Sequence, residues 1–216
     1  SGAVFHNAGM VLKSAGSGTS AINLPFLNTG VVTNQTGTLA FNGGGTLGGT
    51  VGAAAGATIN FAAGNFTLNA MPVFVGLGTV QFTGSFIFFT VAISDFTLTG
   101  GTLAGTNTVS GVLNWTGGNI SGVFTVASNA TLNLSGAATK TLISSATVTN
   151  WGTMVWTNSG LFSAGSSQIY NQPGAVFELQ NDQTFVHSGA VFHNAGMVLK
   201  SAGSGTSTIN LPLLNT

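Results

Sequence analysis

The chain has 216 residues, of which 44% are hydrophobic and 33 are glycine, and three basic and three acidic residues give it a net charge of zero. Three dispersed lysines cannot neutralise the phosphates of a nucleic acid or attract an anionic membrane surface, which excludes both as partners. The absence of cysteine excludes disulfides and cysteine-based metal sites, and the high hydrophobicity excludes a disordered chain.

The elements that the sequence predicts are short strands. Runs of alternating small polar and large apolar residues, most of them ending in glycine, lie in chain order at 37–44, 57–64, 78–84, 96–101, 112–118, 130–136, 154–160, 175–180 and 190–196. Alternation is the period of a strand, and the Thr, Val, Ile, Phe and Trp in these runs favour strands. Gly-Gly, Asn-Gly and Ser-Gly pairs predict the turns. No stretch has helical spacing free of glycine, so we expect an all-β protein.

The spacing of these runs favours a parallel β-helix, a β-solenoid that we expect to be right-handed, over an array of β-sandwiches. One large apolar anchor per run recurs at a spacing of about 20 residues, which is typical of one solenoid turn. These anchors are Phe41, Phe61, Phe82, Leu98, Trp115, Leu134, Trp156, Phe177 and Phe192. In a solenoid each turn stacks on the last, and like residues form ladders in which stacked like charges are unfavourable. That explains why only 3% of the residues are charged. We expect about nine to eleven turns.

A much longer repeat contains the short one. Residues 188–216 repeat residues 1–29, and only Ala21/Thr208 and Phe26/Leu213 differ. Ser188 is therefore the equivalent of Ser1, and the long repeat begins again there. We interpret residues 1–187 as one full long repeat and residues 188–216 as the start of the next copy. The two differences favour diverging copies within one longer chain over identical subunits that polymerise.

Several segments resemble a known class of repeats. The stretches "FLNTGVVTNQTGTLAFNGGGTLGGTVGAAAGATINF" (26–61), "SGVLNWTGGNISGVFTVASNATLNLSG" (110–136) and "VTNWGTMVWTNSG" (148–160) are similar to the tandem repeats of giant bacterial cell-surface or secreted proteins, of autotransporter-like or adhesin-like type. The resemblance implies a parallel β-helix, a location outside the cell or on the bacterial surface, and a scaffold, adhesin or filament role. It supplies no catalytic motif.

Few residues could carry chemistry. Glu178, Asp182 and His187 lie close together in the sequence, and His193 follows shortly after them. They could form a carboxylate–imidazole pair or a weak metal site, but we favour the interpretation that they mark an edge turn of the solenoid or the turns where two repeat copies join. His6 and His193 occupy the same place in the two copies, which indicates a structural role. The sequence has no Arg, and it predicts no catalytic residue, no cofactor, no metal site and no enzyme.

Three surface features remain as candidates. The run "FIFFTVAI" is apolar on both strand faces, so Phe86, Phe88 and Phe89 either meet a neighbouring loop or form a lateral contact between fibres. Exposed tryptophans in a row would form a platform for glycans, for which the candidates are Trp115, Trp151 and Trp156. Threonines within 96–108 and 139–149 offer pieces of an ice-binding face.

The function that we predict is structural. The chain is expected to be a non-enzymatic segment of a repetitive extracellular fibre or surface filament, with further copies of the repeat as its partners. An adhesin-type module that binds glycans or cells is the main alternative, and an ice-binding solenoid is a minor one.

Overall fold

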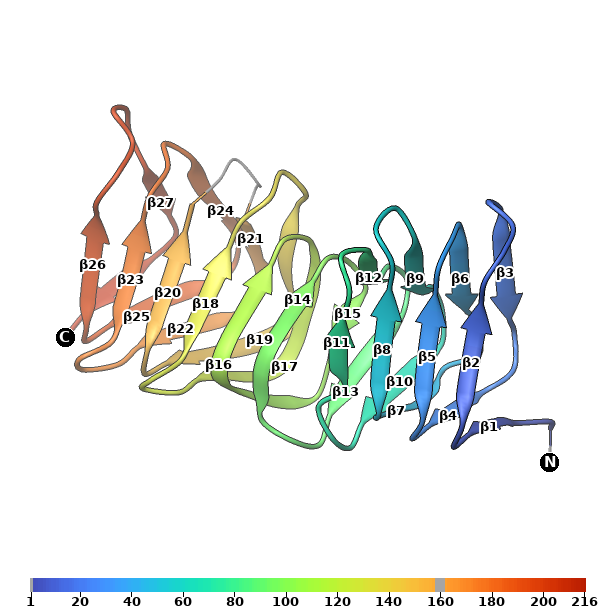
Figure 1. Ribbon diagram of the computed structural model, residues 1–216. Helices are drawn as coiled ribbons and strands as arrows, with labels where there is room; N and C mark the ends of the chain where they lie inside the picture. Colours follow the sequence, from blue (N-terminus) through green and yellow to red (C-terminus); the bar gives the residue numbers. More distant parts are fainter. Residues whose placement is uncertain (1, 158–161) are drawn as a thin grey trace. The chain divides into compact units, whose positions relative to one another are not determined.

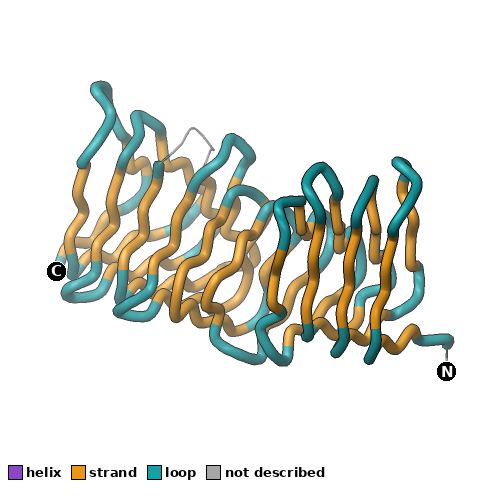
Figure 2. Tube along the Cα trace, viewed as in Figure 1, coloured by secondary structure: helices purple, strands orange, loops and turns teal. Residues whose placement is uncertain are grey.

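The computed structural model describes residues 2–157 and 162–216, and it divides into two compact units, Ser1–Val91 and Ala92–Thr216. The described residues form strands and turns without any helix, as Figure 2 shows. The all-β prediction is therefore confirmed. The cause lies in the alternating Thr, Val and Phe runs, which suit a pleated surface and offer no helical stripe.

The first unit consists of short strands, drawn from blue to cyan-green in Figure 1. Their bounds are β1 (Phe5–Asn7), β2 (Met10–Lys13), β3 (Thr19–Ile22), β4 (Phe26–Asn28), β5 (Val31–Asn34), β6 (Thr38–Phe41), β7 (Gly45–Leu47), β8 (Thr50–Ala53), β9 (Thr58–Phe61), β10 (Asn65–Leu68), β11 (Val73–Val75), β12 (Thr79–Phe82) and β13 (Phe86–Phe89).

These strands form three parallel faces, because every third strand pairs in register. The first face contains β1, β4, β7, β10 and β13, the second contains β2, β5, β8 and β11, and the third contains β3, β6, β9 and β12. Each turn of the chain thus adds one strand to each face. This arrangement is a parallel β-helix.

The second unit continues the same plan with some longer strands. Their bounds are β14 (Ile93–Leu98), β15 (Thr102–Leu103), β16 (Thr106–Trp115), β17 (Gly118–Val126), β18 (Thr131–Leu134), β19 (Lys140–Asn150), β20 (Thr153–Trp156), β21 (Phe162–Gly165), β22 (Gln168–Asn171), β23 (Val176–Leu179), β24 (Thr184–Ser188), β25 (Val191–Asn194), β26 (Met197–Lys200), β27 (Thr208–Asn210) and β28 (Leu213–Asn215).

The long strands of the second unit turn the corner between two faces. β19 pairs with β21 through Lys140–Leu142 and with β22 through Thr147–Asn150. The bend between these two halves is made by Ser144 and Ser145, which both have φ near 54°. From β20 to β28 the pairing has a regular three-strand period, with parallel pairs such as β20–β23, β23–β26 and β25–β28. The described residues make about ten turns in all, as expected.

Two inward columns of large residues build the core. Phe41, Phe61 and Phe82 occupy one register position of the third face, with ring centroids 5.2 and 4.7 Å apart and the rings nearly parallel. In the second unit a column of the second face is formed in register by Leu98, Trp115, Leu134, Trp156 and Leu179. All of these side chains are buried. Apart from Leu179, they are all anchors that the sequence indicated.

The other two anchors do not continue these columns. Phe177 pairs with Met154 on the second face, and Phe192 pairs with Ile169 on the first face. The separation of Phe177 and Phe192 along the chain is less than one full turn, because the two residues lie on different faces. Within one column of the first unit, by contrast, equivalent positions such as Phe41 and Phe61 recur about every 20 residues.

Close stacking also determines where glycine is needed. Gly45 has φ of +135°, and a Cβ atom there would lie 2.0 Å from the carbonyl oxygen of Phe26 in the preceding turn. Glycine is therefore required at this position both by its backbone conformation and by the close approach of the preceding turn.

Replacement of Phe61 by Ala is expected to destabilise the first unit by about 3–5 kcal/mol, because it removes the middle ring of a buried stack. Urea unfolding measures this loss. Thr79→Ala, an exposed outward position of the same face, is the control and should change stability by less than about 0.5 kcal/mol. Equal effects of the two substitutions would contradict the stacked core.

Candidate functional site

The two copies of the terminal sequence fold in the same way. β25, β26, β27 and β28 correspond to β1, β2, β3 and β4, and β25 pairs with β28 as β1 pairs with β4. The hydrogen bonds match as well: the Phe5 amide donates to the Pro25 carbonyl at 2.8 Å, and the Phe192 amide to the Pro212 carbonyl at 2.9 Å. The two substitutions leave this conformation unchanged.

The second copy stacks directly on the last turn of the first. β22, β23 and β24 pair in parallel with β25, β26 and β27. Backbone amides of the second copy donate to carbonyls of the preceding turn at 2.8–3.1 Å, from Val191 to Ser167, Ala195 to Asn171, Met197 to Ala175, Ser201 to Leu179 and Thr208 to Gln183. We call the contacts between residues 165–187 and residues 188–210 the joint, and it is the candidate functional site.

A ladder of asparagine amides crosses the joint. The side-chain amide of Asn150 donates to Asn171 at 2.9 Å, Asn171 donates to Asn194 at 2.8 Å, and Asn194 donates to Asn215 at 2.7 Å. Asn171 also donates to the carbonyl of Met197 at 3.0 Å. Asn150, Asn171 and Asn194 are buried. Because each amide is both donor and acceptor, identical residues satisfy one another in a stack.

On the outside of the first face, His193 contacts the turn before it. Its Nε2 is hydrogen-bonded to Gln168 Oε1 at 2.9 Å, and its ring stacks on Tyr170 with centroids 4.5 Å apart and planes 12° from parallel. His193 therefore pairs with an amide and a phenol ring, not with a carboxylate.

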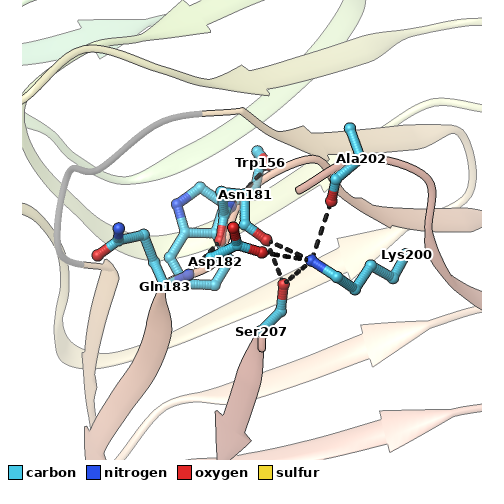
Figure 3. A network of polar contacts seen from close by, with 7 residues as sticks. All are labelled: Trp156, Asn181, Asp182, Gln183, Lys200, Ala202 and Ser207. Carbon is cyan, nitrogen blue, oxygen red and sulfur yellow. Dashed lines mark hydrogen bonds and ion pairs between the residues drawn. The ribbon is translucent and has the colours of Figure 1, made fainter. Parts of the chain in front are cut away.

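At the corner between the second and third faces, Lys200 binds residues of both copies (Figure 3). Its Nζ donates to Asp182 Oδ1 and to the Asn181 carbonyl of the first copy, both at 2.8 Å. It also donates to the Ala202 carbonyl at 2.9 Å and to Ser207 Oγ at 3.0 Å in the second copy. Lys200–Asp182 is the one ion pair found within the described residues.

Asn181 organises the first-copy side of this corner. Its side-chain amide donates to the Trp156 carbonyl of the turn below at 2.8 Å, and its Oδ1 accepts from the Gln183 amide at 2.8 Å (Figure 3). Its own carbonyl also accepts from Ser207 Oγ. These bonds hold the carbonyl of Asn181 where Lys200 reaches it.

Glu178 forms the second acidic contact across the joint. It accepts hydrogen bonds from Ser201 Oγ at 2.5 Å and from Gln180 Nε2 at 2.8 Å. These bonds hold the pKa of Glu178 below its ordinary value, and the hydrogen bond from Lys200 does the same for the pKa of Asp182. Both carboxylates are therefore charged at neutral pH.

The residues of the ionisable cluster lie in different settings. Glu178, on β23, and Asp182, in the turn that follows, each contact the second copy. His187 makes a local contact instead, accepting from the Gly189 amide through Nδ1 at 3.0 Å. Over residues 2–157 and 162–216, no group of three or more His, Asp or Glu side chains is placed to hold a metal ion.

Sequence reasoning missed the role of the lysines. Lys13 donates to the carbonyls of Ala15 and Gly16, and the buried Lys140 donates to those of Gly136 and Ala138. Burial lowers the pKa of Lys140. Like Lys200, both lysines bind carbonyls of the loop between the second and third faces. In the sequence, each of these lysines lies next to a loop of Ser, Ala and Gly residues, and this pattern could have indicated that the lysine binds loop carbonyls.

The tryptophan platform does not form. Trp115 and Trp156 are fully buried in the inward column of the second face, and only Trp151 is exposed, at 47%. Large indole rings at inward register positions fill the solenoid, so these two cannot meet a glycan at the surface.

The phenylalanine run is divided between the inside and the outside. Phe86 is 48% exposed and Phe88 is half-buried, whereas Phe89 is buried in the core. Strand alternation explains the difference, because Phe86 and Phe88 point outward and Phe89 points inward. A lateral contact there could use Phe86 and Phe88, and Phe89 is removed from the candidates.

The threonines gather on the first face of the second unit. Thr106 and Thr108 stack in register on Val123 and Thr125, which stack on Thr147 and Thr149. Gln168 and Tyr170 occupy these two positions in the next turn. The threonine patch therefore ends after three turns.

Comparison with protein-family models, with curated proteins and with solved structures finds no match to this chain. Among the described residues there is no helix that is long and apolar enough to cross a membrane.

Replacement of Asn171 by Leu is expected to loosen the joint by about 1–3 kcal/mol, because the buried Asn194 Oδ1 and the Met197 carbonyl lose the amide that donates to them and Asn150 loses one acceptor. Hydrogen exchange at the amides of Ala195 and Met197 should become roughly 5- to 100-fold faster. Asn133→Ala, in a half-buried amide pair with Asn114, is the control and should leave both amides unchanged. Unchanged exchange in Asn171→Leu would argue against the ladder.

Stability should also depend on pH through Glu178 and Asp182. Their pKa values are lowered in the folded chain, so their contribution is present above the ordinary values of 4.5 and 3.8 and is lost as the pH falls through the folded values. The difference in urea midpoint between the native chain and the Glu178→Gln/Asp182→Asn variant should be constant above about pH 5 and should vanish in stronger acid. A difference that persists at about pH 2 would contradict this assignment.

Proposed function

We propose that this chain is a structural, non-enzymatic segment of a repetitive extracellular fibre or bacterial cell-surface filament, built by end-to-end stacking of β-solenoid copies. The observation that carries the proposal is the joint. The start of the second copy stacks in register on the last turn of the first, with backbone pairing on all three faces, an asparagine ladder on the first face and an ion pair at the corner between the other two. A repeat that continues the ladder of its predecessor is suited to extension.

Stacking of this kind also protects the edges of the solenoid. The last turn of a solenoid presents unpaired strand groups that invite aggregation unless they are capped. At the joint, the first turn of the second copy covers that edge for β22, β23 and β24. Each copy in an array would cap the one before it.

The location outside the cell or on the bacterial surface is supported by the similarity of the repeats to those of giant surface and secreted proteins. The composition is compatible with it, because a nearly uncharged surface lacks the repulsion that keeps soluble proteins apart. Further copies of the repeat are the partners that we propose. The glycan-binding alternative is left with Trp151 alone, so we favour the structural role.

Proteins with one, two and four copies of the long repeat, residues 1–187, test this proposal. Electron microscopy should show rods that lengthen by a constant increment of roughly 45 Å per copy, at about 4.8 Å per turn. Unfolding midpoints should rise with copy number, because each new joint adds a neighbour contact. Separate globules joined by linkers, with a midpoint independent of copy number, would disprove the stacked filament.

The same micrographs test lateral association through Phe86 and Phe88. Phe86→Asp should reduce side-by-side bundling without changing the length of single rods, because it places a charge on an apolar contact. Thr67→Asp is the matched control, since Thr67 lies one turn from Phe88 on the same outer surface and carries no ring. Unaltered bundling in Phe86→Asp would exclude this contact.

A further inference from the structure

A pocket lies on the outer side of the first face in the first unit. Its volume is about 330 Å³, and residues of three successive turns line it. His6, Leu27 and Thr46 occupy one outward register position on β1, β4 and β7. Ala8 and Thr29 lie in the turns that follow β1 and β4, at the corner towards the second face. None of the three tryptophans lines this pocket.

The inner wall of the pocket is fixed by the asparagine ladder of the first copy. The side-chain amide of Asn7 donates to Asn28 Oδ1 at 2.7 Å and to the Val31 carbonyl at 3.0 Å, and that of Asn28 donates to the Gly48 carbonyl at 2.6 Å. Asn7 and Asn28 are both buried. A wall whose polar groups are already bonded needs no ordering when a ligand enters, which lowers the cost of binding.

Three other lining side chains have bonding capacity to spare. The His6 ring and the Thr46 hydroxyl have no hydrogen-bond partner within residues 2–157 and 162–216. Thr29 Oγ1 makes only a long hydrogen bond, 3.4 Å to the carbonyl of Asn7. A hydroxyl group and a neutral imidazole can each donate one hydrogen bond and accept another. The pocket therefore suits a ligand whose own groups both donate and accept.

The rest of the lining is apolar and uncharged. Leu27 and Ala8 supply the apolar surface, and no lysine, aspartate or glutamate lines the pocket. A carboxylate, phosphate or ammonium group would lose water there without gaining a counter-charge. Hydroxyl groups beside an apolar C–H surface are the chemistry of a neutral sugar ring. The volume is near the lower end of the range for small-molecule sites, about 300–1,000 Å³, which limits the ligand to one or two rings.

We propose that this pocket binds a neutral saccharide of one or two rings. Hydrogen bonds to His6, Thr29 and Thr46 hold its hydroxyl groups, and Leu27 contacts its C–H face. This site goes beyond the structural role, because it places a sugar-binding function on the outer surface of the solenoid.

The site does not depend on where the sequence begins. Six of its seven lining residues recur unchanged in the second copy, at 193–195 and 214–216. There the preceding turn is in place, and yet Ala195 stays exposed and His193 is only half-buried. The ring of His193 is held by a hydrogen bond and by stacking on the preceding turn. A tandem array would thus carry one site per long repeat, and only this multivalence rests on the proposed function.

The test titrates the full chain with maltose, cellobiose and lactose and follows the backbone amides of Ala8, Thr29 and Thr46 by nuclear magnetic resonance. At least one disaccharide should shift these amides saturably, with a Kd of about 1–20 mM, because a small open pocket buries little of its ligand. Sorbitol, a flexible polyol without a ring, should leave them unchanged. The proposal is overturned if no disaccharide saturates below about 100 mM, or if sorbitol causes the same shifts.

Two variants of the full chain assign the binding to the pocket. Thr46→Val removes a hydroxyl at nearly constant shape and should weaken binding roughly 3- to 10-fold, and His6→Phe, which keeps a ring without its nitrogens, should do the same. Thr67→Val is the matched control, since Thr67 pairs with Thr46 in the following turn and does not line the pocket. Native affinity in both Thr46→Val and His6→Phe, or an equal loss in Thr67→Val, would also overturn the proposal.

The tandem proteins separate this proposal from the proposed function. Retention on beads that carry the best of the three disaccharides should increase more steeply than copy number from one to four copies, because linked sites bind together. Rods that form but bind no disaccharide would retain the filament and overturn the pocket. Binding by tandem chains that form no rods would retain the pocket and contradict the filament.

Discussion

In-register parallel stacking is the constraint on which the rest of this structure depends. Each outward or inward position lies one strand spacing, about 4.8 Å, from its equivalent in the next turn, so a side chain must be compatible with a neighbour of its own kind. Asparagine satisfies this rule because its amide is donor and acceptor, and phenylalanine satisfies it by stacking. A column of carboxylates would not, which accounts for a chain that is only 3% charged.

The three lysines and Asp182 lie at or beside corners, where the ladder rule is relaxed. Lys13 and Lys140 bind backbone carbonyls, which are available in every loop and require no matching acid. Lys200 adds Asp182 from the preceding turn, and Glu178 accepts from Ser201. These contacts join unlike residues across the joint. They make the pairing of turns at the joint specific. A uniform asparagine or threonine ladder lacks this specificity, because it pairs equally well with any other turn of the same kind.

The sequence was sufficient to predict the strands, the parallel stacking and most of the core. Phe41, Phe61 and Phe82 could be placed in one column because strand alternation and a nearly constant separation coincide there. Phe177 and Phe192 could not, because spacing along the chain does not say which of three faces a strand joins. Trp115 and Trp156 were expected both as anchors and as candidates for a surface platform, and strand alternation places them inward. The bonds of Lys200 depend on how two corner loops fold against each other, which periodicity does not describe.

The two substitutions between the copies show how much freedom stacking leaves. Phe26 is buried against Phe5 and Phe41, with centroids 5.5 and 4.4 Å away, and Leu213 replaces it in the second copy. Thr208 pairs with Thr184 of the preceding turn through its backbone while its side chain is exposed, and Leu213 pairs with Phe192 of its own copy. The side chains that bond to the preceding turn, including those of His193, Asn194, Lys200 and Ser201, are identical to their counterparts. Identity is thus retained in the side chains that bond across the joint.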